Sequence, residues 1–190
     1  MTIQINQTGN WIDVSVPLHS GIPTWPGSPT FQAKLHRDPA LGSPTRDTWI
    51  SLDVHTGTHM EFSKHIFEDG KELEELGPTY FCGLVEVADL VADDEGDISW
   101  SPIHPDIVGV LWKTGNSHGR LWEQASFQPN FKGLPLPVAQ RLIDISGIRF
   151  VGADYLSIEA MATEGAVHRQ LLGAGIAIVE GLDLGHISPG

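Results

Sequence analysis

The 190-residue chain has a single cysteine and few basic residues. With Cys82 alone, neither an intramolecular disulfide nor a paired-cysteine zinc or redox motif can form. Only 11 basic residues stand against 24 acidic ones, so the net charge of −13 repels nucleic acid and anionic membrane surfaces and favours cations. We therefore expect neither nucleic acid nor a membrane as a partner.

The sequence predicts neither a secretory signal nor a membrane-spanning segment. Its first residues have neither the basic nor the apolar stretch of a secretory signal, and no apolar run is long enough to cross a bilayer. Together with the cysteine content, this predicts a cytoplasmic protein. The length suits one domain with a sizeable core, and glycine and proline are spread along the chain, so we expect residues 1–190 to form a single domain.

The apolar pattern predicts a β-rich α/β fold. One helix is expected from near Pro137 to a stop at Gly147, and a second from about Ile158 to Leu172, ending at Gly173. The order helix, strand, helix, strand in the C-terminal third predicts an α/β unit with buried strands. Further β-rich runs predict strands at Trp11–Leu18, Trp49–His55, Leu84–Leu90, Ile107–Trp112, Ile148–Ala153 and Gly175–Glu180.

What the chain does have is a dense group of metal-capable side chains. Three of its nine histidines and one glutamate fall within the eleven residues from His55 to His65. Imidazole and carboxylate are ligands of Zn, Mn, Fe and Ni ions. The spacing of His55 and His59 would suit a helix, but Gly57 and its β-branched neighbours argue against one. In an extended chain, His55, His59 and Glu61 point to the same side, so we predict an extended strand of ligands for a divalent cation.

Two histidines and one carboxylate do not close a metal site, so further ligands must come from elsewhere in the chain. His168 lies on the second predicted helix. Glu180 ends the apolar run Ile176–Val179, where a carboxylate is costly to bury unless it is paired or bound to a cation. Both are candidate ligands, although each taken alone could be an ordinary surface residue. The other histidines have no such context and are interpreted as structural or exposed: His19, His36, His104, His118 and His186.

The segment from His55 to His65 resembles the motif HxGTHxDxPxH of the cyclase family of metal-dependent hydrolases, the group that contains bacterial kynurenine formamidase and isatin hydrolase. Matching positions are His55, Gly57, Thr58, His59 and His65. The resemblance covers nearly the whole chain and includes Trp25-Pro-Gly27, Val151–Ser157, His168–Leu172 and Ile178–Leu184.

The resemblance implies a β-rich α/β domain of the swivelling β/β/α type, with a mixed sheet and few helices. It also implies a homodimer or a higher homo-oligomer. His65 matches the family's acid/base catalyst. One or two divalent ions, Zn or alternatively Mn, are expected to bind at the positions His55, His59, Glu61, His168 and Glu180.

Two residues depart from the family motif. Glu61 replaces an aspartate, which keeps the carboxylate but adds a methylene, and metal–ligand distances vary by only about ±0.2 Å. Ser63 replaces a proline, which we expect to free the backbone before His65. The change at Glu61 affects how many ions are expected to bind, and the change at Ser63 affects the expected orientation of the catalytic His65.

From these residues we predict a metal-dependent hydrolase of a small aryl-linked amide, either an N-formyl arylamine such as N-formylkynurenine or a lactam. Metal binding lowers the pKa of water from 15.7 to about 7, which supplies a hydroxide nucleophile. His65 would act as acid/base and protonate the departing nitrogen. Among the aromatic residues, Trp25 is predicted to contact the small-molecule substrate.

Two alternatives stay open. The first is a cyclisation or dehydration in secondary metabolism on the same scaffold, which the altered Glu61 and Ser63 would permit. The second is a non-catalytic domain that binds a metal ion or a ligand. His65 argues against the second alternative, because a purely structural site has no need of an acid/base residue.

Overall fold

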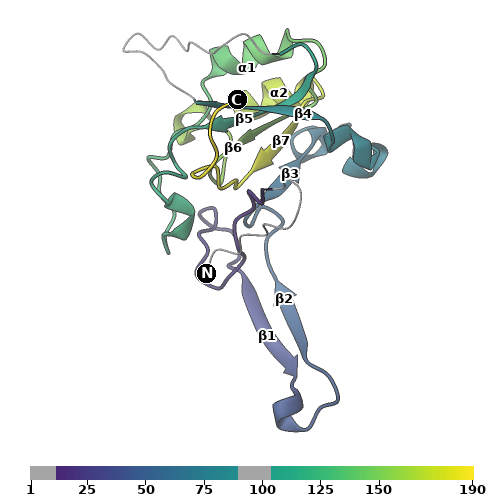
Figure 1. The fold of residues 1–190 in the computed structure, drawn as a ribbon, viewed down its shortest axis with the longest axis vertical. Helices are drawn as coiled ribbons and strands as arrows, with labels where there is room; N and C mark the ends of the chain where they lie inside the picture. Colours follow the sequence, from purple (N-terminus) through teal and green to yellow (C-terminus); the bar gives the residue numbers. More distant parts are fainter. Residues whose placement is uncertain (1–11, 90–103) are drawn as a thin grey trace.

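The computed structural model describes residues 12–89 and 104–190. In these ranges a five-stranded sheet forms the body, with strand order β3-β7-β6-β5-β4 (Figure 1). Four strands run parallel, and β3 pairs antiparallel with β7 at one edge, so the predicted mixed α/β sheet is confirmed. The strands are β3 (His59–Glu61), β4 (Leu84–Asp89), β5 (Ile107–Lys113), β6 (Phe150–Ala153) and β7 (Ala177–Glu180).

Two helices cover one face of this sheet, namely α1 (Leu136–Ile143) and α2 (Ala166–Gly173) (Figure 1). Leu142 of α1 and Leu171 of α2 are fully buried against Ile178 of β7 in one apolar cluster. Burial of each such side chain contributes about 1.5–3 kcal/mol, so the helices are held mainly by their apolar faces. Within the described ranges, no helix is long and apolar enough to cross a membrane.

The opposite face of the sheet is covered by loops. Phe150 and Val179 pack there with Phe62, and Tyr80 lies against the same cluster. Because both faces are covered, β5, β6 and β7 are almost continuously apolar, as expected of buried parallel strands.

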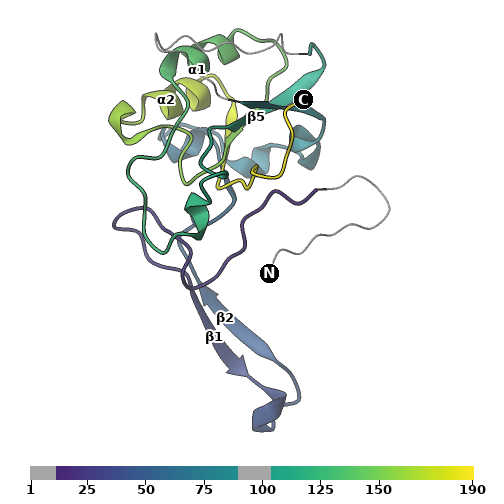
Figure 2. The same ribbon diagram turned by 60° about the vertical axis from the view of Figure 1, so that its left-hand side comes forward.

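A two-stranded antiparallel hairpin, β1 (Gln32–Arg37) and β2 (Asp47–Ser51), projects away from the body (Figures 1 and 2). Every residue of β1 is exposed, and only Ser51 of β2 is partly buried. The sequence analysis missed β1, because this segment has no β-branched residues and neither of its faces packs on the core.

Several predicted boundaries were wrong. Within the described part of Trp11–Leu18, only Ser15 forms a β-bridge, to Leu182; Trp11, like Leu90 at the end of another predicted strand, lies outside the described residues. The second helix starts at Ala166 and not near residue 158, because left-handed backbone at residues 164 and 165 separates it from a short 3-10 turn.

Candidate metal centre

The segment that carries His55 is a turn, which corrects the prediction of an extended strand of ligands. Gly57 has a φ of +73°, and an added Cβ would lie 2.6 Å from Cδ2 of Leu18, so the turn requires glycine. The Asp53 carboxylate accepts the backbone N–H of His55 at 2.9 Å. The chain becomes extended only at His59, and the turn brings Nδ1 of His55 to 3.2 Å from Nε2 of His59.

Thr58 and Gly181 hold this turn against the end of β7. The Thr58 hydroxyl donates to the Gly181 carbonyl at 2.6 Å and accepts the backbone N–H of Val16 at 2.9 Å. Gly181 has a φ of +70°, and a Cβ there would lie 2.2 Å from the Gly57 carbonyl oxygen. Backbone thus packs directly on backbone at Gly181, which requires glycine there, while the Thr58 hydroxyl joins the two segments by its hydrogen bonds.

The register of β3 and β7 brings the remaining side chains together. His59 lies opposite Glu180 and Glu61 opposite Ile178, on the face covered by α2. Nε2 of His59 is 3.4 Å from Oε2 of Glu180. From α2, Nε2 of His168 lies 3.2 Å from Oε1 of Glu180 and 3.2 Å from Oε2 of Glu61. Two strands, a turn and a helix therefore bring their side chains together at one point.

Among the residues described, these side chains form two groups with metal-ligand geometry: His55, His59 and Glu61, and then Glu61, His168 and Glu180. Within each group the ligand atoms lie within 4.8 Å of one another. Glu61 belongs to both, because its Oε1 lies 2.8 Å from Nδ1 of His55 while its Oε2 faces His168. The structure thus brings together all five residues that the sequence analysis selected as ligands.

Two of the histidines are oriented by hydrogen bonds behind the cluster. Nδ1 of His59 lies 3.0 Å from the Gly57 carbonyl oxygen, and Nδ1 of His168 lies 2.5 Å from Oε1 of Glu159. A neutral ring that donates from Nδ1 presents the lone pair of Nε2 to the cluster, as metal-binding histidines do. The sequence analysis missed Glu159, because an isolated acid in a loop carries no signal until the fold places it behind His168.

The electrostatics of the cluster favour a cation. Burial lowers the pKa of His59, but Glu180 and Glu61 outweigh it and raise that pKa to about 10. Burial likewise opposes charge on His168, yet Glu159, Glu180 and Glu61 raise its pKa to about 12. Burial raises the pKa of Glu61, but its histidine neighbours hold it far below the ordinary range. The carboxylates therefore attract positive charge, which two protons or a divalent cation can supply.

One oxygen in particular fits a metal ion. Oε2 of Glu61 is buried and accepts no hydrogen bond from any described residue. A carboxylate oxygen at this depth is costly without a partner. When His168 gives up its second proton to bind a cation, the neutral ring that donates from Nδ1 offers this oxygen no hydrogen bond, so the cation takes that place. The donor set of imidazole and carboxylate with this unpaired oxygen suits Zn or Mn.

His65 lies at the edge of the same cluster, in a short 3-10 helix, Ser63–His65. Its Nε2 is 3.4 Å from Oε1 of Glu61, and its ring centroid is 4.6 Å from that of His55. Burial lowers the pKa of His65; Glu61 opposes this, and the neighbouring His55 and His168 lower it further. The net direction is downward, which favours a neutral ring.

The backbone before His65 is held despite the loss of the family's proline. The Ser63 hydroxyl accepts the backbone N–H of Lys71 at 2.9 Å, and the Ser63 carbonyl accepts that of Phe67 at 2.9 Å. Gly70 packs against this turn so closely that a Cβ would lie 2.3 Å from the Ser63 carbonyl carbon. The serine therefore ties the turn to the following loop.

A cavity of about 200 Å³ opens onto the cluster. Trp25, predicted to contact substrate, lines it and lies edge-on to Phe127, with ring centroids 5.1 Å apart. Leu156 and Ser157, which follow the carboxyl end of β6, also line it, and the sequence analysis missed both. Ligands of parallel α/β sheets commonly bind at this edge.

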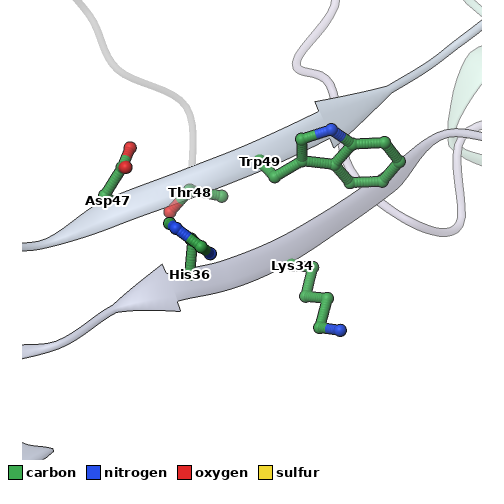
Figure 3. A pocket seen from close by; sticks show the side chains of 5 residues that line it. All are labelled: Lys34, His36, Asp47, Thr48 and Trp49. Carbon is green, nitrogen blue, oxygen red and sulfur yellow. The ribbon is translucent and has the colours of Figure 1, made fainter.

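A larger hollow of about 520 Å³ lies on the projecting hairpin (Figure 3). Its side chains come from both strands and include one imidazole and one carboxylate, too few ligands for a metal site. We therefore locate the chemistry at the smaller cavity. The hairpin residues are Lys34, His36, Asp47, Thr48 and Trp49.

Comparisons with known proteins identify the family and the fold of this chain. Residues 12–160 match the model of the Cyclase family, described as "Putative cyclase". Kynurenine formamidase of Bacillus cereus is 29% identical over 186 residues, which span 97% of this chain and 87% of that protein. A solved structure of a potential metal-dependent hydrolase with cyclase activity superposes with a TM-score of 0.73 at 32% identity, over 94% of this chain and 84% of the other. Isatin hydrolase A of Ralstonia solanacearum shares the fold, with a TM-score of 0.74 at 18% identity over 94% and 81% of the chains.

Proposed function

Because the chain belongs to the Cyclase family, we propose that it is a metal-dependent hydrolase of a small aryl-linked amide. The observation that carries the proposal is that two groups of metal-ligand side chains and His65 meet at one cavity. The relatives support the reaction class, since one is named kynurenine formamidase and another a potential metal-dependent hydrolase. We propose an N-formyl arylamine, such as N-formylkynurenine, or a lactam as the substrate.

The residues that would hold one or two divalent ions in this proposal are the five clustered side chains, and Glu61 is the member that the two groups share. The cation is Zn or Mn, because imidazole with carboxylate suits both. A divalent ion held there supplies an activated water and polarises a carbonyl group. The buried, unpaired Oε2 of Glu61 is the feature that a cation would satisfy.

His65 is proposed to move the proton. Its lowered pKa keeps the ring neutral at neutral pH, so Nε2 can take a proton from the attacking water. The resulting imidazolium is stabilised by the Glu61 carboxylate, 3.4 Å away, and then protonates the departing nitrogen. This last step matters because an amide ion is too basic to leave without a proton.

Trp25 is proposed to contact the aryl group of the substrate. It lines the cavity while its ring is held edge-on by Phe127 and Phe131, at centroid distances of 5.1 and 6.4 Å. Aromatic pairs prefer such offset or edge-on contacts, so a fixed indole can orient a second flat ring. Leu156 adds an apolar surface to the same cavity.

We further propose that the protein is a cytoplasmic homodimer or higher homo-oligomer with one domain per chain. The hairpin supports the assembly. Leu35 and Ile50 are 45% and 53% exposed and lie on one hairpin face, since Leu35 pairs with Thr48 and Ile50 with Ala33. A two-stranded hairpin is only marginally stable in water, and exposed apolar patches commonly mark interaction surfaces.

The test is an assay of purified protein on N-formylkynurenine and isatin, before and after removal and restoration of Zn or Mn. We expect metal-dependent turnover of one substrate, and His65→Ala should retain the metal but lose about 10²–10⁴-fold in kcat. His36→Ala, on the hairpin, is the matched control and should remain fully active. Failure to bind metal under every loading condition would disprove the proposal.

A further inference from the structure

Glu159 is a buried carboxylate directly behind the proposed ligand His168. Its Oε1 lies 2.5 Å from Nδ1 of His168, and its Oε2 accepts the backbone N–H of Val167 at 3.1 Å and the hydroxyl of Thr163 at 2.5 Å. The residue is 5% exposed and does not line the cavity. These contacts therefore act on His168, on the start of α2 and on the 3-10 turn that precedes it.

These contacts decide which nitrogen of His168 carries the proton. An ionised carboxylate only accepts hydrogen bonds, so a neutral imidazole beside Glu159 must carry its N–H at Nδ1. Nε2 is then left with a lone pair, and it points at Glu61 and Glu180, each 3.2 Å away. The bond to Val167, the residue before His168, ties the same carboxylate to the helix backbone and so fixes the ring orientation.

We propose that Glu159 is a positioning residue that holds His168 in the tautomer and orientation needed to bind a divalent cation together with Glu61 and Glu180. The inference rests on the proposed function, because it presupposes a metal at this group. Partners of this kind behind a metal-binding histidine raise its basicity, and their loss typically costs 10–100-fold in metal affinity.

A purely structural role for Glu159, as an anchor for the start of α2, predicts different behaviour. Glu159→Gln keeps a carbonyl oxygen that can accept from Val167 and Thr163, but it then turns an amide N–H₂ toward Nδ1 of His168. That donor favours the opposite tautomer, with hydrogen on Nε2, which cannot bind a cation. Thr163→Val is the matched control, because it removes a contact to the same carboxylate without touching the imidazole.

The experiment titrates Zn²⁺ into wild type, Glu159→Gln and Thr163→Val in competition with a chromophoric chelator. Absorption spectra of the Co²⁺-loaded proteins and thermal unfolding of the metal-free proteins accompany it. We expect Glu159→Gln to lose about 10–100-fold in Zn²⁺ affinity and to change the Co²⁺ spectrum, while its metal-free unfolding temperature stays close to that of Thr163→Val. Thr163→Val should bind Zn²⁺ like wild type.

Two results would overturn the inference alone. One is wild-type Zn²⁺ affinity and an unchanged Co²⁺ spectrum in Glu159→Gln. The other is an equal loss of affinity in both variants with an equal drop in unfolding temperature, since Glu159 would then act only as an anchor for α2. A wild-type protein that binds no Zn²⁺ would overturn the proposed function as well.

Discussion

Gly181→Ala tests whether the backbone contact between the turn at Gly57 and the end of β7 positions the metal ligands. A methyl group at residue 181 would lie 2.2 Å from the Gly57 carbonyl oxygen, which must therefore move by roughly 1 Å to reach an ordinary contact distance. That oxygen accepts the hydrogen bond from Nδ1 of His59. Because metal–ligand distances tolerate only about ±0.2 Å, the shift should disrupt the cation site.

The effect on stability follows from two contributions. A side chain in the left-handed region costs about 1–2 kcal/mol, and overpacking adds about 1–3 kcal/mol, so we expect a loss of about 2–5 kcal/mol. Gly175→Ala is the matched control, since Gly175 has a φ of +79° but nothing within 4 Å of an added Cβ. It should incur only the conformational cost.

The assay measures the free energy of unfolding by denaturant and the Zn²⁺ affinity of both variants. We expect Gly175→Ala to keep wild-type affinity and Gly181→Ala to lose most of it. If both variants bound Zn²⁺ equally well, the contact between the turn and β7 would not position the ligands, and the reasoning would be refuted.

Three further predictions concern the proton-transfer residue, the assembly and the cation. Gly70→Ala would push on the Ser63 backbone and misplace His65 by roughly 1 Å, so kcat should fall about 10²-fold while the Zn²⁺ affinity stays unchanged. Gly77→Ala is the control: an added Cβ there has one contact, at 3.8 Å, so this variant should have wild-type kcat in the same assay. Ile50→Asp should convert the oligomer to monomer in light scattering, and an unchanged mass would contradict the proposed role of the hairpin. In metal-free protein the raised pKa values of His59 and His168 give stability that is complete below about pH 6.5 and is lost as pH rises through about 10 for His59 and about 12 for His168. Unfolding midpoints measured across pH check this. Zn²⁺ should abolish the loss, and a midpoint independent of pH without metal would contradict the charge assignment.

The ligand residues could be selected from the sequence, but their arrangement could not. The density of imidazole and carboxylate near residue 55 selected three ligands, and a carboxylate at the end of an apolar strand selected Glu180. His168 was selected by its place on the second predicted helix and by the family resemblance. The interpretation of His55 and His59 as ligands on one extended strand was wrong, because Gly57 between them adopts a positive φ and turns the chain. His55 returns to His59 through a turn, and only His59 and Glu61 share a strand face.

The supporting residues were beyond sequence reasoning for a physical reason. Glu159 acts on His168 only because the loop after β6 folds back over α2, and Thr58 acts only because its turn meets Gly181, 123 residues away. Local patterns carry no information on such contacts. The hairpin strand β1 was missed for a related reason, since it lacks the buried face from which strands are recognised.

The central claim is that the five clustered residues hold a divalent cation, and anomalous diffraction from crystals loaded with Zn²⁺ or Mn²⁺ tests it most directly. We predict anomalous peaks within coordination distance of Glu61, with Nε2 of His168 and Glu180 on one side and the His55–His59 pair on the other. An anomalous map with no peak in this cavity, or with the ion on the hairpin, would contradict the claim.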